Sequence, residues 1–190
     1  MEPYKFVKLN INDARLIIPI LNEDFRGSVR KIYSKEIFKK DGIIFDCVED
    51  LIIYSKKNVI RGLHFQKKEG QSKIVQVIKG KIFAVILDID EKSETFGKWT
   101  SIEMNNNGEM IYIPEKCAFG SFALEDSYIL CKCGNKFIAE YSDGILWNDK
   151  DINVDWPLDK LDGEVVLSDK DKRLQLFKEY LNIIKNNERE

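Results

Sequence analysis

The middle of the chain consists of short apolar runs separated by turn signals. The clearest pair is KIVQVI (Lys73–Ile78) and KIFAVILDI (Lys81–Ile89), between which only Lys79 and Gly80 lie. A two-residue connection with glycine is typical of a tight hairpin, because glycine readily adopts the positive φ of such turns. Two similar runs follow: Glu109–Pro114 and Ser127–Cys133. Strands at this regular spacing predict an all-β antiparallel sandwich or barrel rather than alternating strands and helices.

The C-terminal region changes to a helical period. One apolar stripe has the spacing of a helix face: Leu174, Phe177, Leu181 and Ile184. Ser168 followed by Asp171 resembles a capping box, with Asp in place of the usual Glu. We therefore expect a single domain over residues 1–190, with a helix over about residues 169–186 packed on the sheet or on a partner subunit.

Composition excludes several classes of function. The 190 residues carry a net charge of −2, which provides no basic field for nucleic acid. No apolar run reaches the roughly 20 residues of a membrane span, and the N-terminal segment lacks the order of a signal peptide. We expect a cytoplasmic protein that binds neither nucleic acid nor membrane, with its four cysteines reduced. With one histidine and no CxxC pair, we expect no metal or cofactor.

The one histidine, His64, lies in the strand-like run Ile60–Gln66. In a regular strand Gly62, His64 and Gln66 share one face, and Arg61 lies on the other. Glycine in a strand often marks close approach of a ligand or of another backbone. A lone histidine is commonly structural, whereas Arg, Gly and Gln beside it favour an anion-binding pocket with one histidine base. The residues by themselves leave both interpretations open.

Six motifs of the chain follow one another in the order typical of one enzyme family. They are RGLHFQ (61–66), QSKIVQVIKGKIFAVILDI (71–89), SETFGKW (93–99), IPEKCAFGSFAL (113–124), ILWNDKDINVDWP (145–157) and LSDKD (167–171). Together they resemble the dTDP-4-dehydrorhamnose 3,5-epimerase family. The resemblance implies a cupin-like jelly-roll barrel and a metal-free homodimer. It also implies a substrate in which a nucleoside diphosphate carries a 4-keto-6-deoxy sugar.

The same resemblance implies catalytic roles. His64 matches the base that removes a proton next to the ketone, at C3, C5 or both. Lys73 matches a lysine near the keto oxygen, where a cation stabilises an enolate. Asp171 matches the aspartate that orients the histidine. The capping box is the alternative role for Asp171, and we do not expect one carboxylate to do both.

The family resemblance also implies which residues bind the substrate. Arginines suit the pyrophosphate or the sugar, because the guanidinium binds phosphate through paired hydrogen bonds. The resemblance, together with the neighbours of His64, gives these binding candidates: Arg26, Arg61, Gln66, Glu49, Phe119 and Lys132.

The chain also departs from the family pattern. Cys131 stands where the family has the tyrosine that returns the proton, and Phe119 replaces a second pocket histidine. Further departures are Lys31, Glu49, Leu51 and Ala84. Three functions are compatible with this pattern. They are an epimerase in which Cys131 or water returns the proton, a keto-sugar isomerase, and a non-catalytic paralogue that binds sugar nucleotide.

Overall fold

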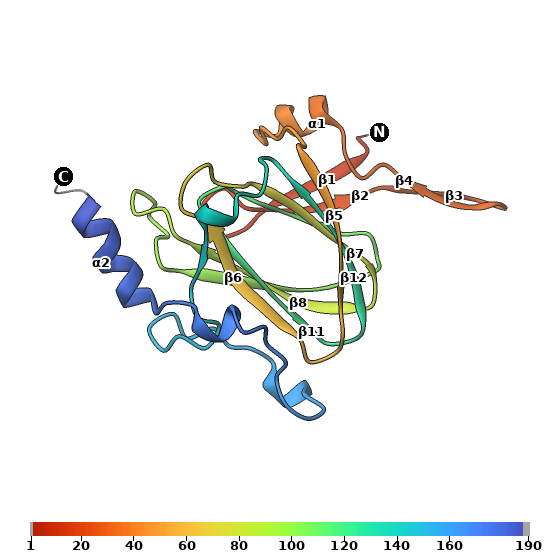
Figure 1. The fold of residues 1–190 in the computed structure, drawn as a ribbon. Coiled ribbons are helices and arrows are strands. Elements are labelled where there is room, and N and C mark those ends of the chain that lie inside the picture. The colour runs from red at the N-terminus through yellow and green to blue at the C-terminus, as the bar shows by residue number, and fades with distance from the viewer. Residues whose placement is uncertain (1, 188–190) are drawn as a thin grey trace.

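The computed structural model describes residues 2–187 and shows two antiparallel sheets packed face to face (Figure 1). The six-stranded sheet contains, in spatial order, β1 (Tyr4–Lys8), β2 (Arg15–Pro19), β10 (Met110–Ile113), β7 (Lys73–Lys79), β12 (Ser127–Cys133) and β5 (Glu49–Ser55). The five-stranded sheet contains β13 (Ser142–Gly144), β6 (Ile60–Gln66), β11 (Cys117–Ala123), β8 (Lys81–Asp88) and β9 (Trp99–Asn105). This mostly-β, cupin-like architecture confirms the predicted fold class.

Smaller elements surround the sandwich. Among the described residues, strands β3 (Leu21–Asp24) and β4 (Gly27–Arg30) pair only with each other, and they project as a hairpin (Figure 1). The short helix α1 (Lys35–Lys40) lies beyond the outer face of the six-stranded sheet. Within residues 2–187 there are also three 3-10 turns: Ala139–Tyr141, Leu158–Lys160 and Asp171–Arg173.

The turn at Lys79 and Gly80 does not form the predicted hairpin. Strand β7 belongs to the six-stranded sheet and β8 to the five-stranded sheet, so this turn carries the chain from one sheet to the other. Each strand finds its partners elsewhere, β7 in β10 and β12, and β8 in β9 and β11. Gly80 has a φ of +86°, and a Cβ at this position would collide with the carbonyl oxygen of Asp126.

Three apolar clusters hold these layers together. The central cluster lies between the sheets and includes Val75 of β7 and Ile82 of β8. A second cluster covers the outer face of the five-stranded sheet, where the C-terminal segment contributes Trp156 and Phe177. The third cluster packs Phe38 of α1 on the six-stranded sheet. Each sheet is therefore buried on its inner face and partly covered on its outer face.

The C-terminal helix begins later than the sequence predicts. Helix α2 spans Phe177–Asn187, and the region expected to open it forms instead the 3-10 turn Asp171–Arg173 followed by an extended stretch. The extended stretch is held by a parallel bridge between Gln175 and Ile145, a backbone pairing that helical periodicity does not reveal. No helix in the part of the chain that the structure describes is long and apolar enough to cross a membrane.

The close backbone approach at Gly80, where the chain passes from one sheet to the other, predicts an effect on stability. Gly80→Ala should lower the free energy of unfolding by about 2–4 kcal/mol, because an L-residue at positive φ is strained and the methyl group meets backbone. Gly42→Ala is the matched control, since Gly42 has a φ of +85° but no atom within 4 Å of the added Cβ. Urea denaturation of both variants measures the difference, and equal losses would contradict the proposed close approach at Gly80.

Candidate active site

A cavity of about 300 Å³ opens between the two sheets. Its wall combines strands of both layers: Leu51 and Ile53 of β5, Lys73 of β7, Cys131 and Cys133 of β12, His64 of β6, and Phe119 and Ser121 of β11. Lys170 closes it from the C-terminal segment. The site therefore depends on the packing of the whole sandwich, because no single element supplies its walls.

A bulge in β6 orients the side chains of Arg61 and His64 toward the cavity. Phe119 of β11 lies opposite His64, whereas Ser121 lies opposite Arg61, so two residues of β6 face the single Gly120. The extra residue resets the alternation of the strand. Arg61 and His64, three residues apart, therefore both line the cavity, which corrects the opposite faces predicted for a regular strand.

His64 and Asp171 are in direct contact although 107 residues separate them. The imidazole Nε2 donates to Asp171 Oδ1, and the Ser168 hydroxyl donates to Oδ2 at 2.8 Å. The backbone N–H of Asp171 returns a hydrogen bond to Ser168 Oγ at 3.0 Å. The carboxylate thus contacts the histidine. Ser168 and Asp171 also bond to each other, but they close a local turn and not the predicted helix cap, because α2 begins only at Phe177.

The surroundings of Asp171 keep its carboxyl ionised. Burial opposes ionisation, but the hydrogen bonds and charge of His64 and the bond from Ser168 outweigh it, so the pKa of Asp171 is lowered. A carboxylate that accepts from Nε2 fixes the proton of the neutral imidazole on that nitrogen. The Nδ1 lone pair is then available, since no hydrogen bond of the described residues involves Nδ1. His64 keeps 37% of its side chain exposed, which leaves it accessible from the cavity.

Lys73 brings a cation to the same cavity. Its Nζ donates to the carbonyl of Gln71 at 3.3 Å, and burial lowers the pKa of the ammonium. None of the ion pairs within residues 2–187 involves Lys73. A cation in this environment is suited to stabilise negative charge that develops on a bound molecule.

Two thiols lie beside this lysine. Cys131 and Cys133 occupy alternate positions of β12, and their Sγ atoms are 3.9 Å apart. The hydrogen bond with Cys133, together with burial, raises the pKa of the Cys131 thiol, which therefore stays protonated near neutral pH. Tyr128 lies on the outer face of the sheet, next to Tyr54. Cys131 thus lies in the cavity with a proton to donate.

The other predicted binding residues in the cavity are Arg61, Gln66 and Phe119, and they differ in how far their polar groups are already bonded within the protein. Arg61 donates through Nε to Ser55 Oγ and through Nη2 to the carbonyl of Tyr54. The Gln66 side chain already bonds to the backbone of three residues: Glu69, Lys136 and Ile138. Gln66 therefore shapes the wall, and its predicted role as a donor to a ligand would require breaking these bonds. Phe119 forms an apolar part of the wall.

Three predicted binding residues do not line this cavity. Arg26 lies at the tip of the β3–β4 hairpin, with 76% of its side chain exposed and an ion pair to Asp24. Lys132 pairs with Asp50 at 3.0 Å, and its strand directs it to the face opposite Cys131. Glu49 accepts from the backbone N–H of Phe137 at 3.1 Å. The family resemblance placed these residues in the pocket. Strand alternation turns Lys132 away from the cavity, and the hairpin carries Arg26 away from it. Glu49 shares a face with Leu51 but lies at the first position of β5, beyond the cavity wall.

The structure also adds residues that the sequence analysis did not select. They are Gln71, Ser121, Cys133, Phe137, Ser142 and Lys170. Strand alternation from Cys131 would have identified Cys133, whereas Lys170 has no signal of this kind because its loop is placed by tertiary contacts. Within residues 2–187, no cluster of three or more His, Cys, Asp or Glu side chains is arranged to hold a metal ion.

Comparison with known proteins identifies relatives along nearly the whole chain. The family model described as dTDP-4-dehydrorhamnose 3,5-epimerase matches residues 8–179. The dTDP-4-dehydrorhamnose 3,5-epimerase of Methanothermobacter thermautotrophicus is 36% identical over 181 residues, which cover 94% of this chain and 97% of that protein.

Solved structures agree with this result. The Bacillus anthracis dTDP-4-dehydrorhamnose 3,5-epimerase with TDP and PPi bound has a TM-score of 0.85 and 34% identity, covering 92% of this chain and 99% of its own. The Legionella pneumophila dTDP-6-deoxy-D-glucose-3,5-epimerase in complex with dTDP-4-keto-L-rhamnose has a TM-score of 0.87 and 30% identity, with coverage of 92% and 93%.

Proposed function

Because the chain belongs to the dTDP-4-dehydrorhamnose 3,5-epimerase family, we propose that it inverts C3, C5 or both in a nucleotide-linked 4-keto-6-deoxy sugar. The contact of His64 with Asp171 inside a cavity that also holds Lys73 is the observation that carries this proposal. The nucleotide is inferred from relatives whose structures contain TDP or a dTDP-sugar.

The first step is removal of a proton next to the ketone. The 4-keto group acidifies the hydrogens at C3 and C5, and His64 takes one of them through Nδ1. Asp171 holds the imidazole and stabilises the positive charge that it acquires. The electrons of the broken C–H bond move onto the keto oxygen and give an enolate, which Lys73 stabilises from the wall of the cavity.

The second step returns a proton to the opposite face of the ring. We assign this role to Cys131, which occupies the position of the tyrosine that serves this purpose in the family pattern. The thiol lies in the cavity and is kept protonated by its surroundings. After donation, the thiolate lies near the ammonium of Lys73, whose charge favours that form.

The role of His64 is tested by exchange in deuterium oxide. His64→Ala should slow washout of the C3 and C5 hydrogens of a dTDP-linked 4-keto-6-deoxy sugar by about 10²–10⁴-fold, as loss of a general base does. Proton NMR measures the washout, and TDP binding with circular dichroism controls for the fold. Near wild-type exchange in the variant would refute the mechanism, and no exchange in the parent protein would favour a non-catalytic paralogue.

The role of Cys131 is tested by separating exchange from inversion. Cys131→Ala should lower net inversion at least about 10-fold while exchange continues, because His64 can return a solvent-derived proton to the face from which it took one. Cys117→Ala is the matched control, since Cys117 is also buried but does not line the cavity. Unchanged inversion in Cys131→Ala would assign the returning proton to water.

We further propose that the protein is a homodimer in which Arg26 reaches the partner's cavity. In the part of the chain that the structure describes, the β3–β4 hairpin pairs with no further strand, and Phe25 at its tip is 98% exposed. An isolated hairpin is marginally stable, so a second surface is expected to support it. The edge strand β5 exposes Ile52 and Tyr54 and also forms a wall of the cavity. A partner's hairpin along β5 would cover this edge and bring Arg26 to the substrate.

Subunit mixing tests this arrangement. Arg26→Ala and His64→Ala proteins, each expected to be poorly active, should regain activity when they form mixed dimers. One site of each mixed dimer then has an intact His64 and receives the intact Arg26 of the other subunit. Random mixing would restore about a quarter of wild-type activity, because half of the dimers are mixed and each has one complete site. Light scattering verifies the dimer, and no recovery in verified mixed dimers would contradict a role for Arg26 in the partner's site.

The four cysteines are free thiols, three of them buried. Cys131 must remain reduced to donate a proton. We therefore propose that the enzyme works in a reducing compartment such as the cytoplasm.

A further inference from the structure

Asp149 is a buried carboxylate outside the cavity, and only 3% of the residue is exposed. Its Oδ1 accepts from the backbone N–H groups of Asp151 and Ile152, both at 2.9 Å. Its Oδ2 accepts from the backbone N–H of Phe177 at 2.9 Å. Within residues 2–187 no cationic side chain forms an ion pair with Asp149, so backbone donors hold its charge. Such an arrangement is costly unless every donor stays in place.

The bond to Phe177 connects two segments that are far apart in the sequence. Phe177 is the first residue of α2, and the N-terminus of a helix carries a partial positive charge that a carboxylate stabilises. Asp149 therefore acts as the cap of α2 from a loop 28 residues earlier. This contact fixes the end of the segment that begins at Asp171.

The same segment is also attached to the strand that carries His64. Leu63, the neighbour of His64, exchanges two backbone hydrogen bonds with Ile145, at 2.9 and 3.0 Å. Leu146 in turn donates to the carbonyl of Gln175 at 2.9 Å. Gln175 therefore pairs with Ile145, which directly follows β13 and is itself bonded to Leu63 of β6. Phe177 lies two residues beyond Gln175. The segment from Asp171 to Phe177 is held at its far end by Asp149 and Ile145 together.

From this geometry we infer that Asp149 is a positioning residue, which keeps Asp171 in contact with His64 by fixing the far end of the segment that carries it. Its effect on turnover rests on the proposed epimerase function. Its effect on the imidazole does not, because the proton position of His64 is observable without substrate. Two readouts therefore separate failure of this inference from failure of the proposed function.

His64 is the one histidine of the chain, so its ring nitrogens give unambiguous signals in 15N NMR. In the parent protein the neutral ring should be protonated at Nε2, because Asp171 accepts from that atom. Asp149→Ala should move the nitrogen signals toward a mixture of both tautomers, in the direction given by Asp171→Ala. It should also lower kcat on the order of 10-fold or more with KM little changed, since misplacing a positioning group costs rate rather than binding.

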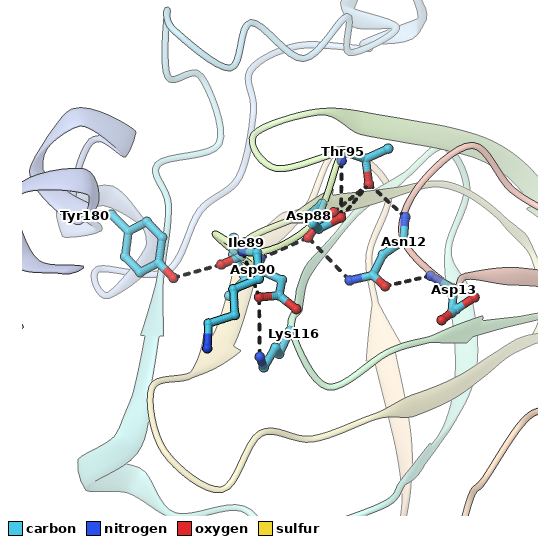
Figure 2. A network of polar contacts seen from close by, with 10 residues as sticks. Asn12, Asp13, Asp88, Ile89, Asp90, Thr95, Lys116 and Tyr180 are labelled. Carbon is cyan, nitrogen blue, oxygen red and sulfur yellow. Dashed lines mark hydrogen bonds and ion pairs between the residues drawn. The ribbon is translucent and has the colours of Figure 1, made fainter. Parts of the chain in front are cut away.

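Asp88→Ala is the matched control. Asp88 is fully buried, and like Asp149 it accepts hydrogen bonds without an ion pair among the described residues. Its donors are Asp90 N–H at 2.9 Å, Thr95 Oγ1 at 2.6 Å and Asn12 Nδ2 at 3.5 Å (Figure 2). It does not line the cavity. Asp88→Ala should lower the unfolding midpoint in urea and leave the tautomer signals of His64 unchanged.

The two variants decide between a positioning role and a purely structural one. The inference is supported if Asp149→Ala shifts the His64 signals and Asp88→Ala does not. It is overturned if the two variants behave alike, or if Asp149→Ala keeps the parent tautomer. If Asp149→Ala does not fold, Asp149→Asn replaces it, because the amide keeps one acceptor oxygen and loses the other. Parent-like signals and kcat in Asp149→Asn would equally overturn the inference.

Discussion

The contact between His64 Nε2 and Asp171 Oδ1 is the interaction on which the site depends. It joins a strand of the five-stranded sheet to the segment that crosses that sheet's outer side, so the sandwich and its C-terminal extension must both be in place. A buried carboxylate is tolerated only where donors satisfy both oxygens, and here His64 and Ser168 do so. His64 can therefore act as a base only when the C-terminal segment is attached to the sheet, because that segment carries Asp171.

The bulge in β6 reconciles two demands on one strand. Ile60, Leu63 and Phe65 must pack in the outer apolar cluster, while Arg61 and His64 must face the cavity. A strict period of two cannot satisfy both sets, because Ile60 and Leu63 are an odd number of residues apart. Gly62 makes the bulge possible, since a side chain there would lie 2.5 Å from the carbonyl oxygen of Phe119.

The cavity is electrically asymmetric. Lys73 and Arg61 bring positive charge, and the carboxylate of Asp171 lies behind the imidazole with its oxygens already bonded. The β12 wall contributes thiols rather than carboxylates, and the pKa of the Cys131 thiol is raised by its hydrogen bond with Cys133 and by burial, so it stays protonated. Such a site favours molecules that carry or develop negative charge, as a sugar diphosphate and its enolate do.

The all-β class, the strand at Ile60–Gln66 and the histidine within it follow from the amino-acid sequence alone. Alternation of apolar side chains reports local burial, and the ordered motifs identified the family. Which strands pair depends on long-range packing, so the residues around Gly80 connect the two sheets and do not form a hairpin within one sheet. Long-range packing also sets where α2 begins, brings Asp171 to His64, and leaves Arg26 outside the cavity. These features depend on partners distant in the chain, and a side-chain period shows which face is buried without showing what lies against it.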